Sequence, residues 1–159
     1  MRRMIGCALT LAMTLTVAPR AFGAACELSA SDLQNRRAVY DAACDAMSPP
    51  RGCTTAGNHG RYVSCVAQEA NADASLPKSC HGAVVKCAAK STCGKPSAVT
   101  CCRTKANGTT KCSTKSQTSA CKAPKGGNAC VSTHASCCDA CTATGCASPS
   151  GAFLDRGGF

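Results

Sequence analysis

The chain has 159 residues, 17 cysteines and a formal net charge of +10, and aromatic residues make up only 3% of it. Between Lys86 and Ala152 there are 11 cysteines and only two large apolar residues, Val99 and Val131. This composition excludes an ordinary hydrophobic core in that stretch, because burying two valines cannot offset the entropy lost on folding. It predicts an interior made of disulfides instead.

Residues 1–23 have the pattern of a secretory signal peptide. A basic start, MRRM, precedes an apolar run of about 14 residues, and small residues follow it. A run of that length is shorter than the roughly 20 residues that span a bilayer. We expect cleavage after Gly23, Ala24 or Ala25, and therefore a secreted, periplasmic or cell-surface protein. No other segment is a candidate membrane span.

Cys26 leaves a second possibility, because the preceding GAAC resembles a lipoprotein processing site, although Gly23 stands where such sites have leucine. Loss of Cys7 with the signal peptide leaves an even number of cysteines, and lipidation of Cys26 would leave an odd number in an oxidising compartment. We therefore expect disulfides at sixteen positions: Cys26, Cys44, Cys53, Cys65, Cys80, Cys87, Cys93, Cys101, Cys102, Cys112, Cys121, Cys130, Cys137, Cys138, Cys141 and Cys146.

Residues 24–92 are predicted to form a helical, disulfide-clamped domain. Ser29 and Asp32 have the spacing of a capping box, and the helix that they open should end before Pro49-Pro50. Further helices are expected over residues 59–72 and from Pro77 to about residue 90. One face of the first helix is expected to carry Leu33, Tyr40, Cys44 and Met47, and one face of the second helix Tyr62, Cys65, Val66 and Glu69. Two ion pairs are expected on the outer side of the first helix, Asp32–Arg36 and Arg37–Asp41.

The third helix would carry both Cys80 and Cys87. Seven residues of helix separate them by roughly 10 Å along the axis, whereas a disulfide needs Cα atoms within about 7 Å. Each cysteine must therefore bond to another element.

Residues 93–146 are predicted to form a basic, cysteine-rich domain containing a β-hairpin. Asn107-Gly108 between two threonine-rich runs is a strong hairpin signal, and strands are expected near residues 99–105 and 110–114. Cys101 and Cys102 should point to opposite faces. With Asn107-Gly108 as a two-residue turn, Cys112 would share the face of Cys101.

Cysteine parity places the boundary between the two parts. Residues 24–92 hold six of the sixteen cysteines and residues 93–146 hold ten, so each part could close its own disulfides. This predicts a junction at CGKP, residues 93–96. The last six cysteines, from Cys121 to Cys146, have an order that resembles the inhibitor cystine knot. That resemblance implies a knot-like module, a class that includes toxins, inhibitors and structural domains. Residues 147–159 are expected to be a flexible tail.

The residues argue against the common catalytic and metal-binding sites. Cys138-x-x-Cys141 near His134 has a zinc-like spacing, but it is a single pair among many competing thiols. Secreted phospholipases place His-Asp after an adjacent cysteine pair, whereas Asp139-Ala140 and Arg103-Thr104 follow the pairs here. No nucleophile-elbow, paired-carboxylate or phosphate-loop motif appears. We therefore predict no enzyme activity, no catalytic residue, no metal and no cofactor.

Charge is the most informative functional feature. Residues 74–138 contain ten lysines and arginines and no acid, and no aromatic residue either. Such a field attracts polyanions, but the lack of aromatic side chains argues against nucleic acid, since bases cannot stack. An acidic polysaccharide, lipid head groups or an acidic protein remain as partners. The predicted anion-binding residues are Lys105, Lys111, Lys115, Lys122 and Lys125.

Taken together, the sequence predicts a small disulfide-rich α+β protein in which cystine-clamped helices precede a cystine-cored hairpin and loop region. The predicted function is that of an exported, non-enzymatic binding module for an anionic partner in the cell envelope or outside the cell. The alternative is a secreted cationic effector, either an antimicrobial or toxin-like peptide or an inhibitor of a secreted protein.

Overall fold

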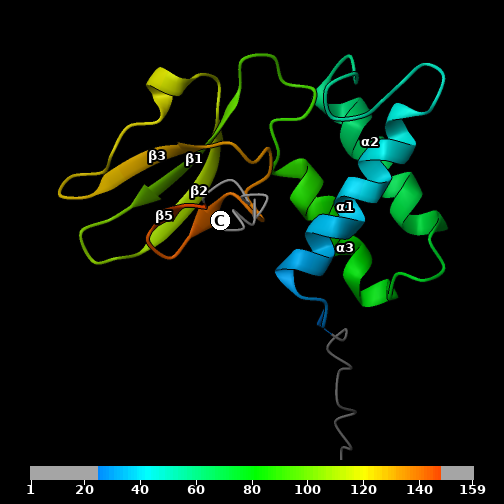
Figure 1. The fold of residues 1–159 in the computed structure, drawn as a ribbon, viewed down its shortest axis with the longest axis horizontal. Coiled ribbons are helices and arrows are strands. Elements are labelled where there is room, and N and C mark those ends of the chain that lie inside the picture. The colour runs from blue at the N-terminus through cyan, green and yellow to red at the C-terminus, as the bar shows by residue number, and fades with distance from the viewer. Residues whose placement is uncertain (1–24, 148–159) are drawn as a thin grey trace, which may run out of the picture.

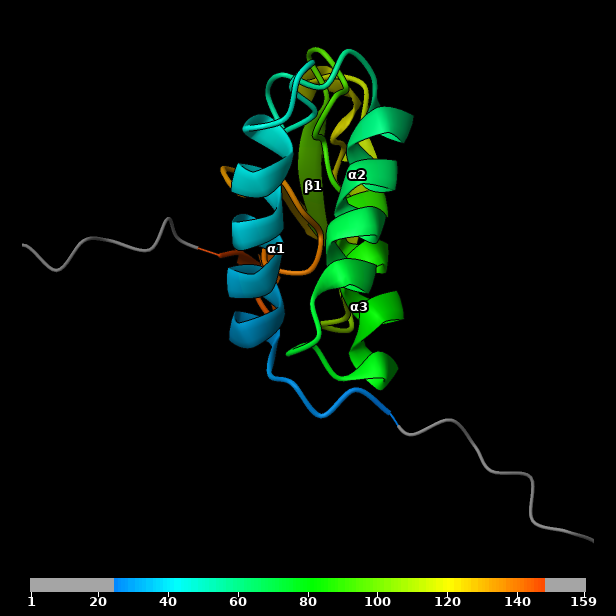
Figure 2. The ribbon, with the colours of Figure 1, turned by 90° about the vertical axis from the view of Figure 1, so that its right-hand side faces the viewer.

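The computed structural model describes residues 25–147, so the predicted signal peptide and all but the first residue of the predicted tail lie outside it. Three helices form one half of the protein, and a small antiparallel sheet forms the other half (Figure 1). The helices lie side by side in front of the sheet when the molecule is turned by 90° (Figure 2). With eight disulfides added, this is a small disulfide-rich α+β fold.

The helices follow the local signals in the sequence. They are α1 (Ala30–Asp45), α2 (His59–Ala72) and α3 (Lys78–Ala89). Ser29 and Asp32 form the expected capping box, the Asn58 side chain accepts a hydrogen bond from the backbone N–H of Arg61 at the start of α2, and Pro77 precedes α3. Helix α2 packs against both α1 and α3.

A conventional core lies between the three helices. Its buried side chains include Tyr40, Tyr62, Val66, Leu76 and Val84, with Leu33 and Met47 packed against them. The prediction of the buried face of α1 is confirmed. Three disulfides hold this half together and close it at one end: Cys26–Cys80, Cys44–Cys65 and Cys53–Cys93. Because the sulfur of Cys26 is bonded to Cys80, it is not free to carry a lipid.

The sheet has three strands in the order β2-β1-β3, and β1 is central. The strands are β1 (Val99–Thr104), β2 (Thr110–Lys115) and β3 (Asn128–Ser132), and a 3₁₀ turn, η1 (Thr118–Ala120), lies between β2 and β3. Two short strands, β4 (Cys141–Thr142) and β5 (Gly145–Cys146), form a separate pair. The sequence predicted the β1–β2 hairpin but not β3, β4 or β5.

The hairpin register differs from the predicted one by one residue. The ladder ends at Thr104 paired with Thr110, and Lys105 N–H then donates to Thr109 O over 3.0 Å. The loop is therefore formed by the three residues 106–108 rather than by two, and Gly108 has a φ of 79°. A three-residue loop with a left-handed last residue is the next most common hairpin connection after the two-residue turn. A shift of one residue turns every side chain to the other face. Cys112 therefore shares the face of Cys102, and the prediction that it shares the face of Cys101 was wrong.

A row of disulfides replaces the apolar core in this half. Cys112, Cys102 and Cys130 are direct neighbours across β2, β1 and β3. They bond to Cys137, Cys141 and Cys146 respectively, and so fasten residues 137–146 over one face of the sheet. Cys101 points to the opposite face and bonds to Cys121. Cys101 and Cys102 are fully buried, whereas Val131 is exposed, in agreement with a cystine interior.

Two disulfides contradict the expectation that each part closes its own cysteines. Cys53–Cys93 and Cys87–Cys138 both cross the predicted junction. The knot-like arrangement was also wrong, since Cys130–Cys146 is the one bridge formed between two of the last six cysteines. Parity failed because cysteines that are distant in sequence meet where residues 135–138 dock against the end of α3: Cys137 N–H donates to Lys90 O over 3.1 Å, and Ser136 Oγ donates to Cys87 O over 2.7 Å.

A buried ion pair also joins the halves. Arg37 Nη2 on α1 lies 3.0 Å from Asp139 Oδ2, and Nδ1 of His134 lies 3.8 Å from the same carboxylate oxygen. The neighbouring Arg36 pairs with Asp73 over 2.8 Å. The predicted Asp32–Arg36 and Arg37–Asp41 pairs are therefore not those that form, because both arginines reach acids that are distant in sequence.

Candidate anion-binding face

The side of the sheet opposite the disulfide row carries the basic side chains. Side chains alternate along a strand, so Arg103 points to the side opposite Cys102, and Lys111 and Lys115 point to the side opposite Cys112. Arg103 lies directly across from Lys111 in the β1–β2 pairing. We call Arg103, Lys105, Lys111 and Lys115 the basic face.

Three members of the basic face converge at the hairpin turn. Arg103, Lys105 and Lys111 line one small hollow of about 90 Å³ together with Pro124. The turn lies at the end of the sheet that points away from the helices (Figure 1). Lys105 and Lys111 are among the predicted anion-binding residues and lie on either side of the Asn107-Gly108 turn, whereas Arg103 was not among the predicted site residues. The alternation of strand residues could have revealed it, since Arg103 is two positions before Lys105.

Lys115 stands at the other end of the edge strand β2. It lines a second, larger hollow of about 340 Å³ with Lys95, Pro96 and Thr114. Four residues of strand separate Lys111 from Lys115, which corresponds to about 13 Å at about 3.3 Å per residue. The basic face thus presents positive charge at two places along one strand.

Lys122 and Lys125 lie on the connection between β2 and β3. Both are exposed and neither lines the two hollows of the basic face. They flank Pro124 in the sequence, and the Cys101–Cys121 bridge anchors this connection to the sheet. The structure therefore places them beside the hollow at the turn rather than within it.

Little negative charge opposes this surface. Asp139 is the one acid among residues 93–147, and its carboxylate is held by Arg37 of the helical half. The seven lysines and arginines of the same stretch therefore give this half of the protein a positive charge that acids of the same stretch hardly neutralise.

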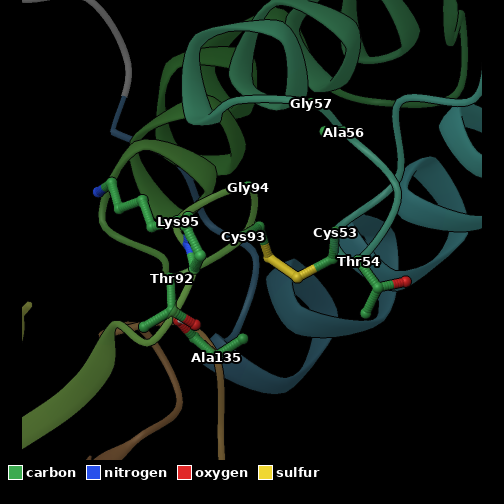
Figure 3. A pocket seen from close by; sticks show the side chains of 10 residues that line it. Cys53, Thr54, Ala56, Gly57, Thr92, Cys93, Gly94, Lys95 and Ala135 are labelled. Carbon is green, nitrogen blue, oxygen red and sulfur yellow. A yellow bond between two sulfur atoms is a disulfide. The ribbon is translucent and has the colours of Figure 1, made fainter. Parts of the chain in front are cut away.

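A larger hollow than these two lies elsewhere, where the two halves meet. It is an open cleft of about 560 Å³ lined by Cys53, Thr54, Ala56, Gly57, Thr92, Cys93, Gly94, Lys95, Pro96 and Ala135. Figure 3 shows the Cys53–Cys93 disulfide in its wall, with Lys95 on the same side as Thr92. The predicted junction at residues 93–96 thus forms part of a cleft.

Lys95 is the charged residue in that cleft. Its Nζ donates a hydrogen bond to Ser91 O over 3.1 Å, and burial lowers the pKa of its ammonium group. Apart from Lys95, the lining consists of small uncharged residues, with no acid or histidine to act as a general base or metal ligand. The lining of this cleft therefore does not suggest a catalytic or metal site.

The segment HASCCDAC is a disulfide junction. Cys137, Cys138 and Cys141 bond to Cys112, Cys87 and Cys102. The sulfurs of Cys102, Cys112 and Cys141 lie within 4.8 Å of one another, but disulfide sulfurs lack the thiolate that binds a metal. The zinc-like spacing of Cys138 and Cys141 arises from two separate bridges.

The other two histidines contact backbone carbonyls. His59 places Nδ1 2.7 Å from Cys93 O and Nε2 3.1 Å from Ala89 O. His81 places Nε2 3.2 Å from Leu76 O. Both rings thus brace the ends of α2 and α3.

Comparison of the chain with protein-family models, with curated proteins and with solved structures found no match. Within residues 25–147 no helix has the length and apolar character needed to cross a membrane. The eight disulfides are compatible with an extracellular protein, since such bonds persist in oxidising compartments.

Proposed function

We propose that this protein is an exported binding module whose basic face binds a linear acidic polymer, most simply an acidic polysaccharide of the cell envelope or the extracellular space. The observation that carries the proposal is the pairing of Arg103 directly opposite Lys111, with Lys105 lining the same hollow. Like charges directly opposite each other destabilise a sheet. A bound anion would relieve that repulsion.

A purely solubilising role accounts poorly for this arrangement. Solubility needs net charge, which lysines spread over the surface would supply. Here the like charges gather on one sheet face, and Asp139, the one acid among residues 93–147, is held by Arg37. Convergence of charge is what a binding surface requires.

The shape of the surface favours a polymer with repeated charges. The two hollows lie about 13 Å apart along β2 by the strand rise, so one chain could meet Lys105 and Lys111 at one end and Lys115 with Lys95 at the other. The face has no aromatic side chain on which nucleic acid bases could stack.

The proposal is tested by the salt concentration at which the protein elutes from an immobilised acidic polysaccharide. We expect the parent to bind at low salt and elute as salt rises, because the Debye length falls from about 10 Å at 0.1 M to about 3 Å at 1 M. The variant Lys105→Gln/Lys111→Gln/Lys115→Gln should elute at clearly lower salt. It should stay folded, because Lys105 and Lys111 are exposed, Lys115 is half-buried, and surface charges contribute little to stability.

The matched control removes the same charge from the helical half. Lys78, Lys86 and Lys90 are exposed residues in and just after α3, and their triple change to Gln lowers the net charge equally. It should elute close to the parent. Equal shifts in both triple variants would mean that net charge alone governs retention, and failure of the parent to bind would contradict the proposal. Leakage of anionic vesicles on addition of the parent would support the cationic effector instead.

A further inference from the structure

We propose that the hollow formed by Arg103, Lys105, Lys111 and Pro124 is a subsite for one tetrahedral oxyanion, a sulfate or phosphate ester group carried by the polymer. This inference rests on the proposed function and names the charged group that the basic face accepts. It also separates sulfated or phosphorylated polymers from those that carry carboxylates alone.

The first reason is an unused hydrogen-bond donor. Nε of Arg103 is buried and has no hydrogen-bond partner among the described residues. Leaving a buried donor of a charged group without an acceptor is unfavourable. Arg103 is one of the residues that line the hollow, so an anion bound there would lie beside this side chain.

The second reason is the enclosure of the hollow. Pro124 forms an apolar wall beside the three cationic side chains, and the hollow is about 90 Å³, compared with about 340 Å³ at the other end of β2. A cavity of this kind suits a single small anion rather than a sugar ring. Partial exclusion of water also strengthens attraction between opposite charges.

Gly127 makes that wall possible. A Cβ at position 127 would lie 2.0 Å from Thr104 O and 2.9 Å from Cγ of Pro124. Only a glycine lets this connection approach the end of β1 so closely. The wall of the hollow is therefore fixed by the backbone and is not a chance position of a surface loop.

The third reason is the number of donors. The guanidinium of Arg103 can offer two parallel N–H groups to two oxygens of one anion, and Lys105 and Lys111 can each offer a further donor. A carboxylate has two oxygens in one plane, whereas a sulfate or phosphate ester has three terminal oxygens directed apart. Three cationic groups converging from three positions match the latter.

The test compares three polymers of similar length on the full-length mature protein: dextran sulfate, dextran bearing phosphate monoesters, and polygalacturonate, which carries only carboxylates. We expect the parent to bind the first two more tightly than the third. Arg103→Lys keeps the charge but removes the fork of donors. It should lose about tenfold in affinity for dextran sulfate and the phosphorylated dextran, which corresponds to one charge-assisted hydrogen bond, and little for polygalacturonate.

Two further variants keep the test decisive. Pro124 lies on the connection between β2 and β3, outside the sheet, so Pro124→Ala can be used if Arg103→Lys folds poorly. It should reduce the preference for sulfated and phosphorylated polymers over polygalacturonate. Lys115→Arg is a matched control that preserves charge at the other end of β2 and should leave the preference unchanged. Equal affinity for all three polymers, unaffected by Arg103→Lys and Pro124→Ala, would overturn the subsite and leave the proposed function standing. Binding of none of them would overturn the proposed function itself.

Discussion

Arg37 and Asp139 form a buried ion pair between two parts of the chain that are 102 residues apart. Their side chains are 11% and 7% exposed. Removing one partner of a buried ion pair leaves the other charge buried without compensation, and this lowers the free energy of unfolding strongly. Replacing both partners by apolar residues of similar volume changes the stability much less. The pair thus holds the helices in place against the C-terminal segment.

The change Asp139→Ala should lower the free energy of unfolding by about 3–5 kcal/mol, measured by urea unfolding with the disulfides intact. Replacing both partners, as Arg37→Met with Asp139→Leu, should restore much of the loss. Arg36→Ala is the control, because its pair with Asp73 is more exposed, and its effect should be much smaller. A loss with Asp139→Ala no larger than that of Arg36→Ala would contradict a structural role for the buried pair.

Asp73 links pH to stability. Hydrogen bonds from Ser75, then from Tyr40, hold the pKa of its carboxyl well below the usual range, while burial and the contact with Asp73 raise the pKa of Tyr40 to about 12. A carboxyl with a lowered pKa in the folded state stabilises the fold above its unfolded pKa of about 4. That stabilisation is lost as pH falls through the folded pKa.

Asp73→Asn should therefore lower the melting temperature at pH 7, and the difference from the parent should shrink as the pH falls below about 4. The comparison uses thermal unfolding by circular dichroism across this range. Glu27→Gln changes an exposed acid and should leave the profile unaltered. A difference between Asp73→Asn and the parent that stays constant with pH would show that Asp73 does not act through its charge.

At the scale of elements, the turn before β3 depends on Gly127. The clash of an added Cβ with Thr104 O leaves no room for a side chain, so Gly127→Ala must displace the turn from β1. We expect it to lower the free energy of unfolding by about 1–3 kcal/mol. Gly82 in α3 has nothing within 4 Å of an added Cβ, and Gly82→Ala should raise stability by up to about 1 kcal/mol.

Urea unfolding of both glycine variants, with the disulfides intact, checks this prediction. A Gly127→Ala protein as stable as the parent would mean that the turn can move away from β1 without loss of stability. The position of Pro124 would then not be fixed by its packing against β1. Since the proposed oxyanion subsite uses Pro124 as its wall, this variant also reports on the rigidity of that subsite.

The elements also separate what the sequence predicts from what it does not. The helices follow from local signals such as the capping box of Ser29 and Asp32, because these involve residues three or four positions apart. The hairpin register depends on whether the turn uses two residues or three, and Asn107-Gly108 fits both. Strand β3 was missed because it pairs with β1 rather than with the strand that precedes it, and residues 116–127, which connect it to β2, carry no strand or hairpin signal.

At the scale of the whole molecule, the pairing of cysteines was beyond local reasoning. The even count predicts that all can be bonded but not which partners meet. Cys87–Cys138 spans 51 residues and forms because residues 135–138 dock on α3. The same long-range packing buries Arg37, which the helix pattern alone places on the surface. For the candidate site, the charge predicted its lysines, and the sheet geometry added Arg103.

The central claim is that the basic face, rather than the overall positive charge, binds an acidic polymer. It is tested most directly by titrating the isotopically labelled, oxidised protein with a short sulfated oligosaccharide and following backbone amide shifts by NMR. We predict saturable shifts over residues 103–115 and 121–127, with helices α1 to α3 unchanged. Shifts concentrated at Lys78, Lys86 and Lys90, or shifts spread evenly over the molecule, would contradict the claim.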